Sequence, residues 1–198
     1  DHTPAYIETW LKHQNRDSFW KHGSICEDFS EIECAVFAVG GWADPYSNAI
    51  PRMLEGLNCP RKGLIGPWAH EYPMRALPGP QIGFLQECLR WWDYWLKGKD
   101  TGIMTDPMLR TWIHESGKPG GVQKESSGFW VGENDWPSSN MTSEHFFLHQ
   151  NGMSAKAQSD TKKMIHHSPL DACAETGVWF PMGIDGDFPE DQRIADAQ

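Results

Sequence analysis

The sequence predicts an α/β part followed by an all-β part. A short apolar run at 34–39 and a second predicted strand at 62–65 each lead into a loop containing glycine, and a helix-forming segment at 51–57 separates them. Such runs are typical of strands that a parallel sheet buries on both faces. After about residue 104, helical periodicity ends and short apolar runs alternate with Gly, Pro, Ser and Asn, which is typical of an all-β part.

The first elements follow from local signals. Thr3 and Pro4 predict the start of a helix, because Thr caps helix N-termini and Pro fits the first helical position, and Gly23 is its expected end. The two apolar runs and the helix between them occupy about 35 residues, which is the length of a βαβ unit. Such a unit has a right-handed crossover and parallel strands.

A second, longer helix is predicted over 81–96. Lys97 and Lys99 follow it, where the helix dipole favours cations, and Gly98 supplies the C-terminal stop. Its apolar residues recur at helical spacing and predict one buried stripe, in which we expect tryptophans to be core rather than a ligand platform. The stripe consists of Leu85, Cys88, Leu89, Trp92, Trp95 and Leu96, with Trp91 beside it.

The β part is expected to begin at a boundary near residue 104. Short strands are predicted at 108–113, 128–131 and 145–149, the last followed by a turn at 150–152. We therefore divide the chain into 1–104 and 105–198.

Composition excludes several function classes. The 198 residues carry a formal net charge of −10, which argues against a nucleic-acid partner, because phosphate binding needs a basic face. No apolar run approaches the roughly 20 residues of a membrane-spanning helix. Five cysteines without CxxC spacing argue against a disulfide framework or a zinc site and favour a cytoplasmic location. We expect no metal and no cofactor.

Two polar residues follow the predicted parallel strands. Asp44 comes after the first strand and His70 after the second. Ligands of open α/β sheets bind outside the carboxyl ends of the strands. In a nucleophilic triad, a carboxylate is the acid member and orients an imidazole, which is the general base. In α/β-hydrolases the acid precedes the histidine in the chain, as Asp44 precedes His70.

Other interpretations of these residues remain open. Any chain of this length has Asp and His on loops, and no G-x-S-x-G nucleophile elbow is present. Trp42 and Trp68 flank the acid and base and either line an acyl pocket or pack beneath the loops. His166-His167 and Asp185-Gly186-Asp187 lack the companions of a zinc or calcium site and are expected to be solvated loops.

Three motifs together resemble the CocE/NonD family of serine hydrolases, which includes cocaine esterase, α-amino acid ester hydrolases and X-Pro dipeptidyl-peptidases. They are VGGWADPY at 39–46, GLIGPWAH at 63–70 and LRWWDYWLKG at 89–98. The segments 10–20 and 171–193 are also similar to parts of that family.

The resemblance implies a fold and a chemistry. The chain would hold the C-terminal part of an α/β-hydrolase domain in 1–104 and the first part of a jelly-roll β-sandwich in 105–198. Asp44 would be the triad acid and His70 the general base, with the nucleophilic Ser upstream of this sequence. The substrate would be an ester, an amide or an X-Pro peptide. Pro45 departs from the Gly that many members carry there.

Two rival functions remain. The chain could act as a binding or assembly module without catalysis, or it could be an inactive truncated piece of the enzyme. An exposed sheet edge would favour self-association, so we expect a homo-oligomer.

Overall fold

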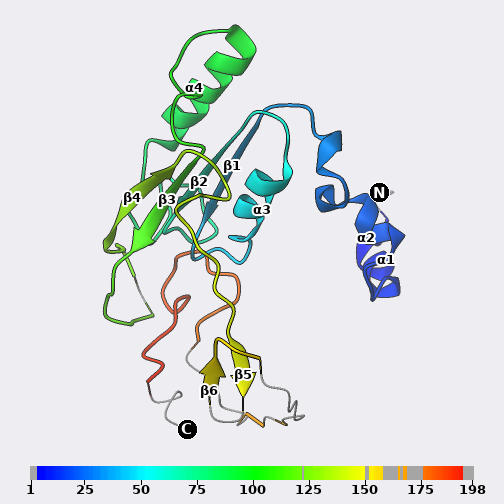
Figure 1. Ribbon diagram of the computed structural model, residues 1–198, viewed down its shortest axis with the longest axis vertical. Helices are drawn as coiled ribbons and strands as arrows, with labels where there is room; N and C mark the ends of the chain where they lie inside the picture. The colour runs from blue at the N-terminus through cyan, green and yellow to red at the C-terminus, as the bar shows by residue number, and fades with distance from the viewer. Residues whose placement is uncertain are drawn as a thin grey trace.

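The centre of the protein is a four-stranded sheet. A computed structural model describes residues 4–121, 123–149, 152–157, 165, 167–168 and 176–193. The sheet has the order β1-β2-β3-β4 (Figure 1), formed by Val36–Gly41, Arg61–Gly66, Leu109–His114 and Gly128–Glu133. The first three strands are parallel, and β4 pairs antiparallel with β3. The predicted mixed α/β architecture with a parallel sheet is therefore confirmed.

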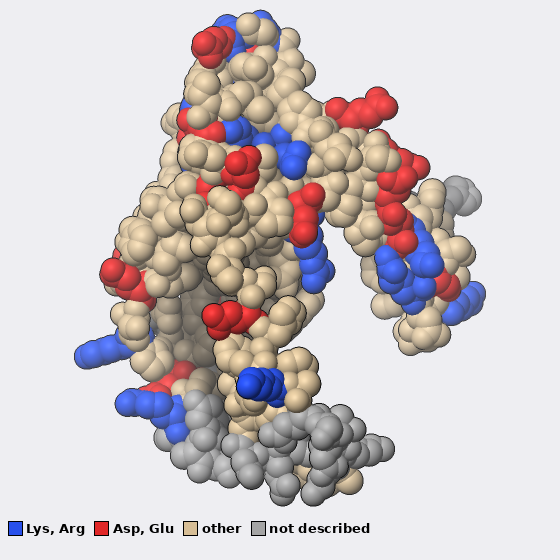
Figure 2. Space-filling model, viewed as in Figure 1, with Lys and Arg blue, Asp and Glu red and all other residues tan. Residues whose placement is uncertain are grey.

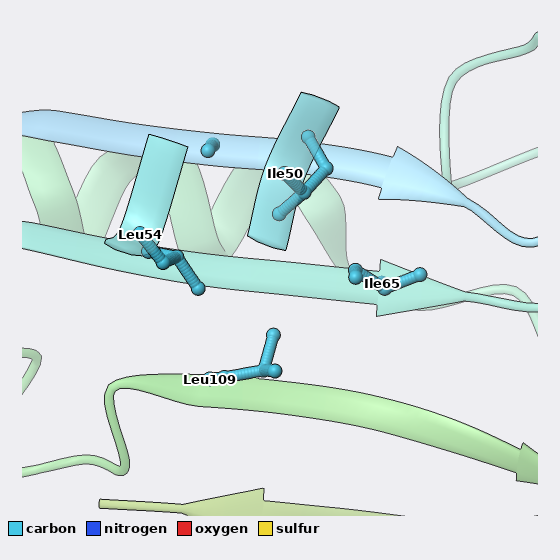
Figure 3. Packing of buried hydrophobic residues seen from close by; sticks show 5 residues of the cluster. Ile50, Leu54, Ile65 and Leu109 are labelled. Atoms are coloured by element: carbon cyan, nitrogen blue, oxygen red, sulfur yellow. The ribbon is translucent and has the colours of Figure 1, made fainter. Parts of the chain in front are cut away.

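The predicted βαβ unit is β1-α3-β2. Helix α3 spans Ala49–Gly56, two residues earlier at its start than expected. It directs Ile50 and Leu54 toward Ile65 of β2 and Leu109 of β3 (Figure 3), and all four are at most 5% exposed. Burying these side chains together excludes water from one face of the sheet, which holds the strand ends in a fixed arrangement.

The N-terminal segment contains two helices instead of the single one predicted. Helix α1 spans Tyr6–Lys12 and α2 spans Ser18–His22, followed by short 3-10 turns at Ile25–Glu27 and Phe29–Glu31. The break arises because the Asp17 carboxylate accepts the N–H of Phe19 and starts a new helix. These helices form an arm beside the sheet (Figure 1).

The expected cap of the first helix is also corrected. The residue before α1 is Ala5, so Pro4 precedes the helix instead of occupying its first position. Thr3 lies outside the described residues.

Helix α4, Phe84–Lys97, presents a different face to the core than predicted. Trp91 is 2% exposed and its ring lies 5.4 Å from that of Phe37. The predicted stripe is largely exposed instead, because the helix turns Trp91, which lies beside that stripe, toward Phe37 of β1. The exposed members are Leu85, Leu89, Trp92 and Leu96. The stop at Gly98 is confirmed: its φ is 65°, and its N–H donates to the carbonyl of Tyr94.

The predicted β part contributes to two sheets. Strands β3 and β4 extend the central sheet, whereas Phe147–His149 (β5) and Gly152–Ser154 (β6) form a separate antiparallel hairpin. The central sheet thus continues across the expected boundary near residue 104. The division of the chain into two domains, 1–104 and 105–198, stays a prediction.

The surface carries both signs of charge. Figure 2 shows acidic and basic side chains interspersed on the visible face, without an extended basic area. No helix in the described part of the chain is long and apolar enough to cross a membrane. The cysteines with described surroundings are free thiols, namely Cys26, Cys34, Cys59 and Cys88; Cys173 lies outside the described residues.

Candidate active site

The ends of β1 and β2 are held close together by their backbones. The N–H of Trp42 donates to the carbonyl of Gly66 at 2.9 Å, and the N–H of Ala43 donates to the carbonyl of Trp68 at 3.1 Å. A Cβ atom on Gly41 would lie 2.0 Å from that same Trp68 oxygen. Only glycine therefore allows the two loops to approach so closely.

This approach brings Asp44 and His70 into contact. Oδ2 of Asp44 lies 2.7 Å from Nδ1 of His70. The other carboxylate oxygen accepts the backbone N–H of Tyr46 at 2.7 Å, which fixes the orientation of the carboxylate. The Asp44 side chain is 13% exposed and that of His70 44%. The carboxylate is thus largely buried, while the imidazole is partly accessible.

The hydrogen bonds of His70 define its chemistry. They use Nδ1 and the backbone N–H, and Nε2 is without a partner among the residues the structure describes. A carboxylate at Nδ1 favours the tautomer that carries its proton there, so the lone pair is on Nε2. That nitrogen can accept a proton from a nucleophile and return it to a leaving group.

A cleft of about 490 Å³ opens beside this pair. Asp44, Trp68 and His70 line it, together with Phe84 of α4 and Met182. Trp68 is 1% exposed and its Nε1 donates to the carbonyl of Pro80, so it packs beneath the loops and forms part of the wall. The cleft is large enough for a small organic substrate.

Trp42 lies away from the cleft. Its Nε1 donates to the backbone carbonyl of Trp112 at 2.7 Å, and it is absent from the cleft lining. This tryptophan links the loop that carries Asp44 to β3.

A second carboxylate near the histidine is engaged elsewhere. Glu71 accepts the backbone N–H of Tyr72 at 2.8 Å and a guanidinium N–H of Arg75 at 2.9 Å. These two donors hold the pKa of Glu71 below its ordinary value. Asp44 is therefore the carboxylate that is hydrogen-bonded to the imidazole.

The loop 176–193 lies at the same end of the sheet (Figure 1). The ring of Phe180 lies 4.2 Å from the imidazole of His70, and the His70 N–H donates to the carbonyl of Pro181 at 2.9 Å. These contacts were not foreseen from the sequence, because the loop lacks a periodic pattern that would place it. The apolar triplet at 178–180 was the signal available.

Two further polar clusters were considered as metal sites in the sequence. Among the described residues, no three His, Cys, Asp or Glu side chains group as metal ligands. The Asp187 carboxylate accepts the N–H groups of Met182 and Ile184, which accounts for its burial. His166 lies outside the described residues, so the expectation for the pair His166-His167 stays a prediction.

A family model matches the first part of the chain. Residues 1–72 match the family described as X-Pro dipeptidyl-peptidase (S15 family). Both Asp44 and His70 fall within the matched segment.

Known relatives are much longer than this chain. Two proteins whose names propose a serine esterase, from Mycobacterium bovis and Mycobacterium tuberculosis, are 33% identical over 87 residues. The match covers 40% of this chain and 14% of each relative. The chain thus spans a small part of their length.

A solved structure has a similar fold. The crystal structure of a CocE/NonD family hydrolase from Staphylococcus aureus superposes with a TM-score of 0.52 at 13% identity. The similarity covers 75% of this chain and 25% of that one. At this identity the likeness establishes the fold alone.

Proposed function

We propose that this chain, whose residues 1–72 match the X-Pro dipeptidyl-peptidase (S15) family, carries the acid and the base of a serine hydrolase of that family. The bond cleaved is an ester or amide acyl bond, and an X-Pro peptide is one form of the amide. The observation that carries the proposal is the 2.7 Å contact between Asp44 and His70 at the carboxyl ends of parallel strands.

The proposed roles follow from the geometry. His70 acts through Nε2 as general base toward a serine hydroxyl and then as general acid toward the leaving group. Asp44 holds the imidazole in the tautomer that this transfer needs and stabilises the imidazolium that forms. The serine would attack the acyl carbon, and water would hydrolyse the resulting acyl-enzyme.

The nucleophile is proposed to lie in a part of the protein outside these 198 residues. The absence of a nucleophile elbow from the sequence supports this, as does the open Nε2 of His70 in the described part of the chain. The relatives, of which the match covers 14%, have ample further length to supply it.

Substitution of the pair in the full-length protein tests the proposal. Asp44→Asn and His70→Ala should each lower turnover of 4-nitrophenyl acetate by on the order of 10²- to 10⁴-fold, with little change in thermal unfolding temperature. Initial rates over a substrate series would give kcat and KM separately.

The chain provides a matched control. His13 and Asp17 form a second His–Asp pair, with Nδ1 and Oδ2 2.6 Å apart, in the N-terminal arm. His13→Ala should leave turnover near that of the wild type. If Asp44→Asn and His70→Ala also kept near-normal turnover, the triad assignment would be wrong. A full-length wild-type protein without turnover would favour a non-catalytic binding module instead.

A further inference from the structure

The loop 176–193 contacts His70 at two points. The Phe180 ring lies against the imidazole, with 4.2 Å between centroids and 52° between planes. The carbonyl of Pro181, the next residue, accepts the backbone N–H of His70 at 2.9 Å. The loop therefore restrains both the backbone and the side chain of His70.

We infer that Phe180 is a positioning residue for His70, an inference that rests on the function proposed above. The hydrogen bond that Nδ1 donates to Asp44 fixes the position of that nitrogen but leaves the ring free to tilt about the contact. With 44% of its side chain exposed, His70 has few neighbours that could prevent such a tilt. A ring packed against the imidazole limits the tilt and keeps Nε2 directed at one place.

The loop is itself firmly held, so Phe180 has a defined position. Oδ2 of Asp187 accepts the N–H groups of Met182 at 2.7 Å and Ile184 at 3.0 Å. The carbonyl of Asp187 accepts the N–H of Val178 at 3.0 Å. Asp187 is 7% exposed, and these three bonds close a turn around Phe180 and Pro181.

Phe180 also connects His70 to the loop that carries Asp44. The ring of Tyr46, two residues after Asp44, lies 5.8 Å from that of Phe180 and 6.1 Å from the imidazole of His70. Aromatic rings at such distances attract one another in edge-on and tilted arrangements. The rings of Tyr46, His70 and Phe180 thus form one cluster, which joins the loop that carries Asp44 to the loop 176–193.

Trp179 provides a control of matched chemistry. Its ring lies 6.1 Å from Tyr46 and 6.1 Å from Phe180, and it forms no ring contact with His70. Its side chain is 75% exposed. Trp179→Ala therefore removes a larger aromatic group from the same loop without removing the contact with the imidazole.

The test compares variants of the full-length protein with 4-nitrophenyl acetate as substrate. Phe180→Ala should lower kcat about 10- to 100-fold and leave KM within about twofold, since a small misplacement of a catalytic group costs rate rather than binding. Phe180→Tyr, which keeps the ring, should restore kcat to within about threefold. Trp179→Ala should stay within about twofold of the wild type.

A second readout measures the reactivity of the nucleophile in a labelling reaction that needs no ester substrate. The rate constant of labelling by an alkyl fluorophosphonate should fall for Phe180→Ala by the same factor as kcat. A thermal unfolding temperature near that of the wild type would separate this effect from damage to the fold. Where Phe180→Ala does not fold, Phe180→Leu takes its place with the same expectation of a kcat loss at unchanged KM.

Each remaining result would overturn the inference. A rise in KM with kcat intact would place Phe180 against the substrate instead of the base. An equal loss in Trp179→Ala would assign the effect to the loop as a whole. Normal activity of Phe180→Ala while His70→Ala is inactive would reject the positioning role alone, whereas normal activity of His70→Ala would reject the proposed function.

Discussion

Gly41 shows how one residue controls the distance between the loops that carry Asp44 and His70. A Cβ atom there would lie 2.0 Å from the carbonyl oxygen and 2.7 Å from the carbonyl carbon of Trp68. Both are backbone atoms, so a rotamer change cannot relieve the clash. The ends of β1 and β2 would have to separate, and the hydrogen bond between Asp44 and His70 would lengthen.

Gly41→Ala should therefore destabilise the protein by about 1–3 kcal/mol, the cost of forcing an extra methyl group into a packed site. It should also reduce the turnover of 4-nitrophenyl acetate proposed for the full-length protein. Urea unfolding and initial rates would measure the two effects. Gly117→Ala is the control, because a Cβ there meets no atom within 4 Å and should change stability by less than about 0.5 kcal/mol. Equal stability of the two variants would contradict this account.

At the scale of elements, an ionic cluster joins α4 to β3. The Glu87 carboxylate of α4 accepts hydrogen bonds from Arg110 of β3 and from Arg90 one turn along the helix. Arg90 also pairs with Asp106 at 3.0 Å. Burial by itself raises the pKa of Glu87, but the two guanidinium groups outweigh it and leave that pKa below its ordinary value.

The lowered pKa of Glu87 makes the stability of this contact depend on pH. A carboxyl whose pKa is lower in the folded state stabilises the fold above its unfolded value of about 4.3, and that contribution is lost as the pH falls through the lower folded value. Glu87→Gln should cost about 1–3 kcal/mol at pH 7, because it removes the carboxylate that pairs with Arg110 and leaves Arg90 with Asp106 alone.

The measurement is urea unfolding of wild type and Glu87→Gln between pH 7 and pH 3. The difference between them should shrink as the pH falls below about 4. Glu55→Gln, a change at an exposed position on α3, should have no such pH-dependent effect. A constant difference between wild type and Glu87→Gln across the range would show that the charge is not the stabilising factor.

At the scale of the whole molecule, large apolar surfaces are exposed. The stripe on α4 that the sequence predicted to be buried is mostly accessible, with Leu85 63% and Leu96 74% exposed. Strands β1 and β4 lie at the two edges of the central sheet. Such a face and such edges favour contact with further polypeptide. The self-association expected of this chain stays a prediction.

A labelling experiment tests whether the nucleophile lies outside this sequence. An alkyl fluorophosphonate should not label the 198-residue chain alone, whereas it should label the full-length protein stoichiometrically, because the reagent reacts with a base-activated serine. Intact mass spectrometry would measure both. Stoichiometric labelling of the 198-residue chain would mean that one of its own side chains is the nucleophile.

Local patterns predicted the elements that carry the candidate site. The apolar runs bounded by glycine became β1 and β2, and the helix between them became α3, because these signals act within a few residues of one another. Asp44 and His70 were predicted as partners since parallel strands end at one edge of a sheet. The break between α1 and α2 was missed because a single side chain, Asp17, creates it.

The sequence by itself determined the parallel strands and placed Asp44 and His70, the proposed acid and base, at their ends. It also carried the resemblance to a hydrolase family that the comparisons then supported. Only the tertiary structure decided which face of α4 is buried, that β3 and β4 extend the central sheet, and that Phe180 and Pro181 contact His70. The physical reason is that strand and helix periodicity are local properties of the chain. Contacts between distant segments depend instead on which surfaces meet when those segments pack together.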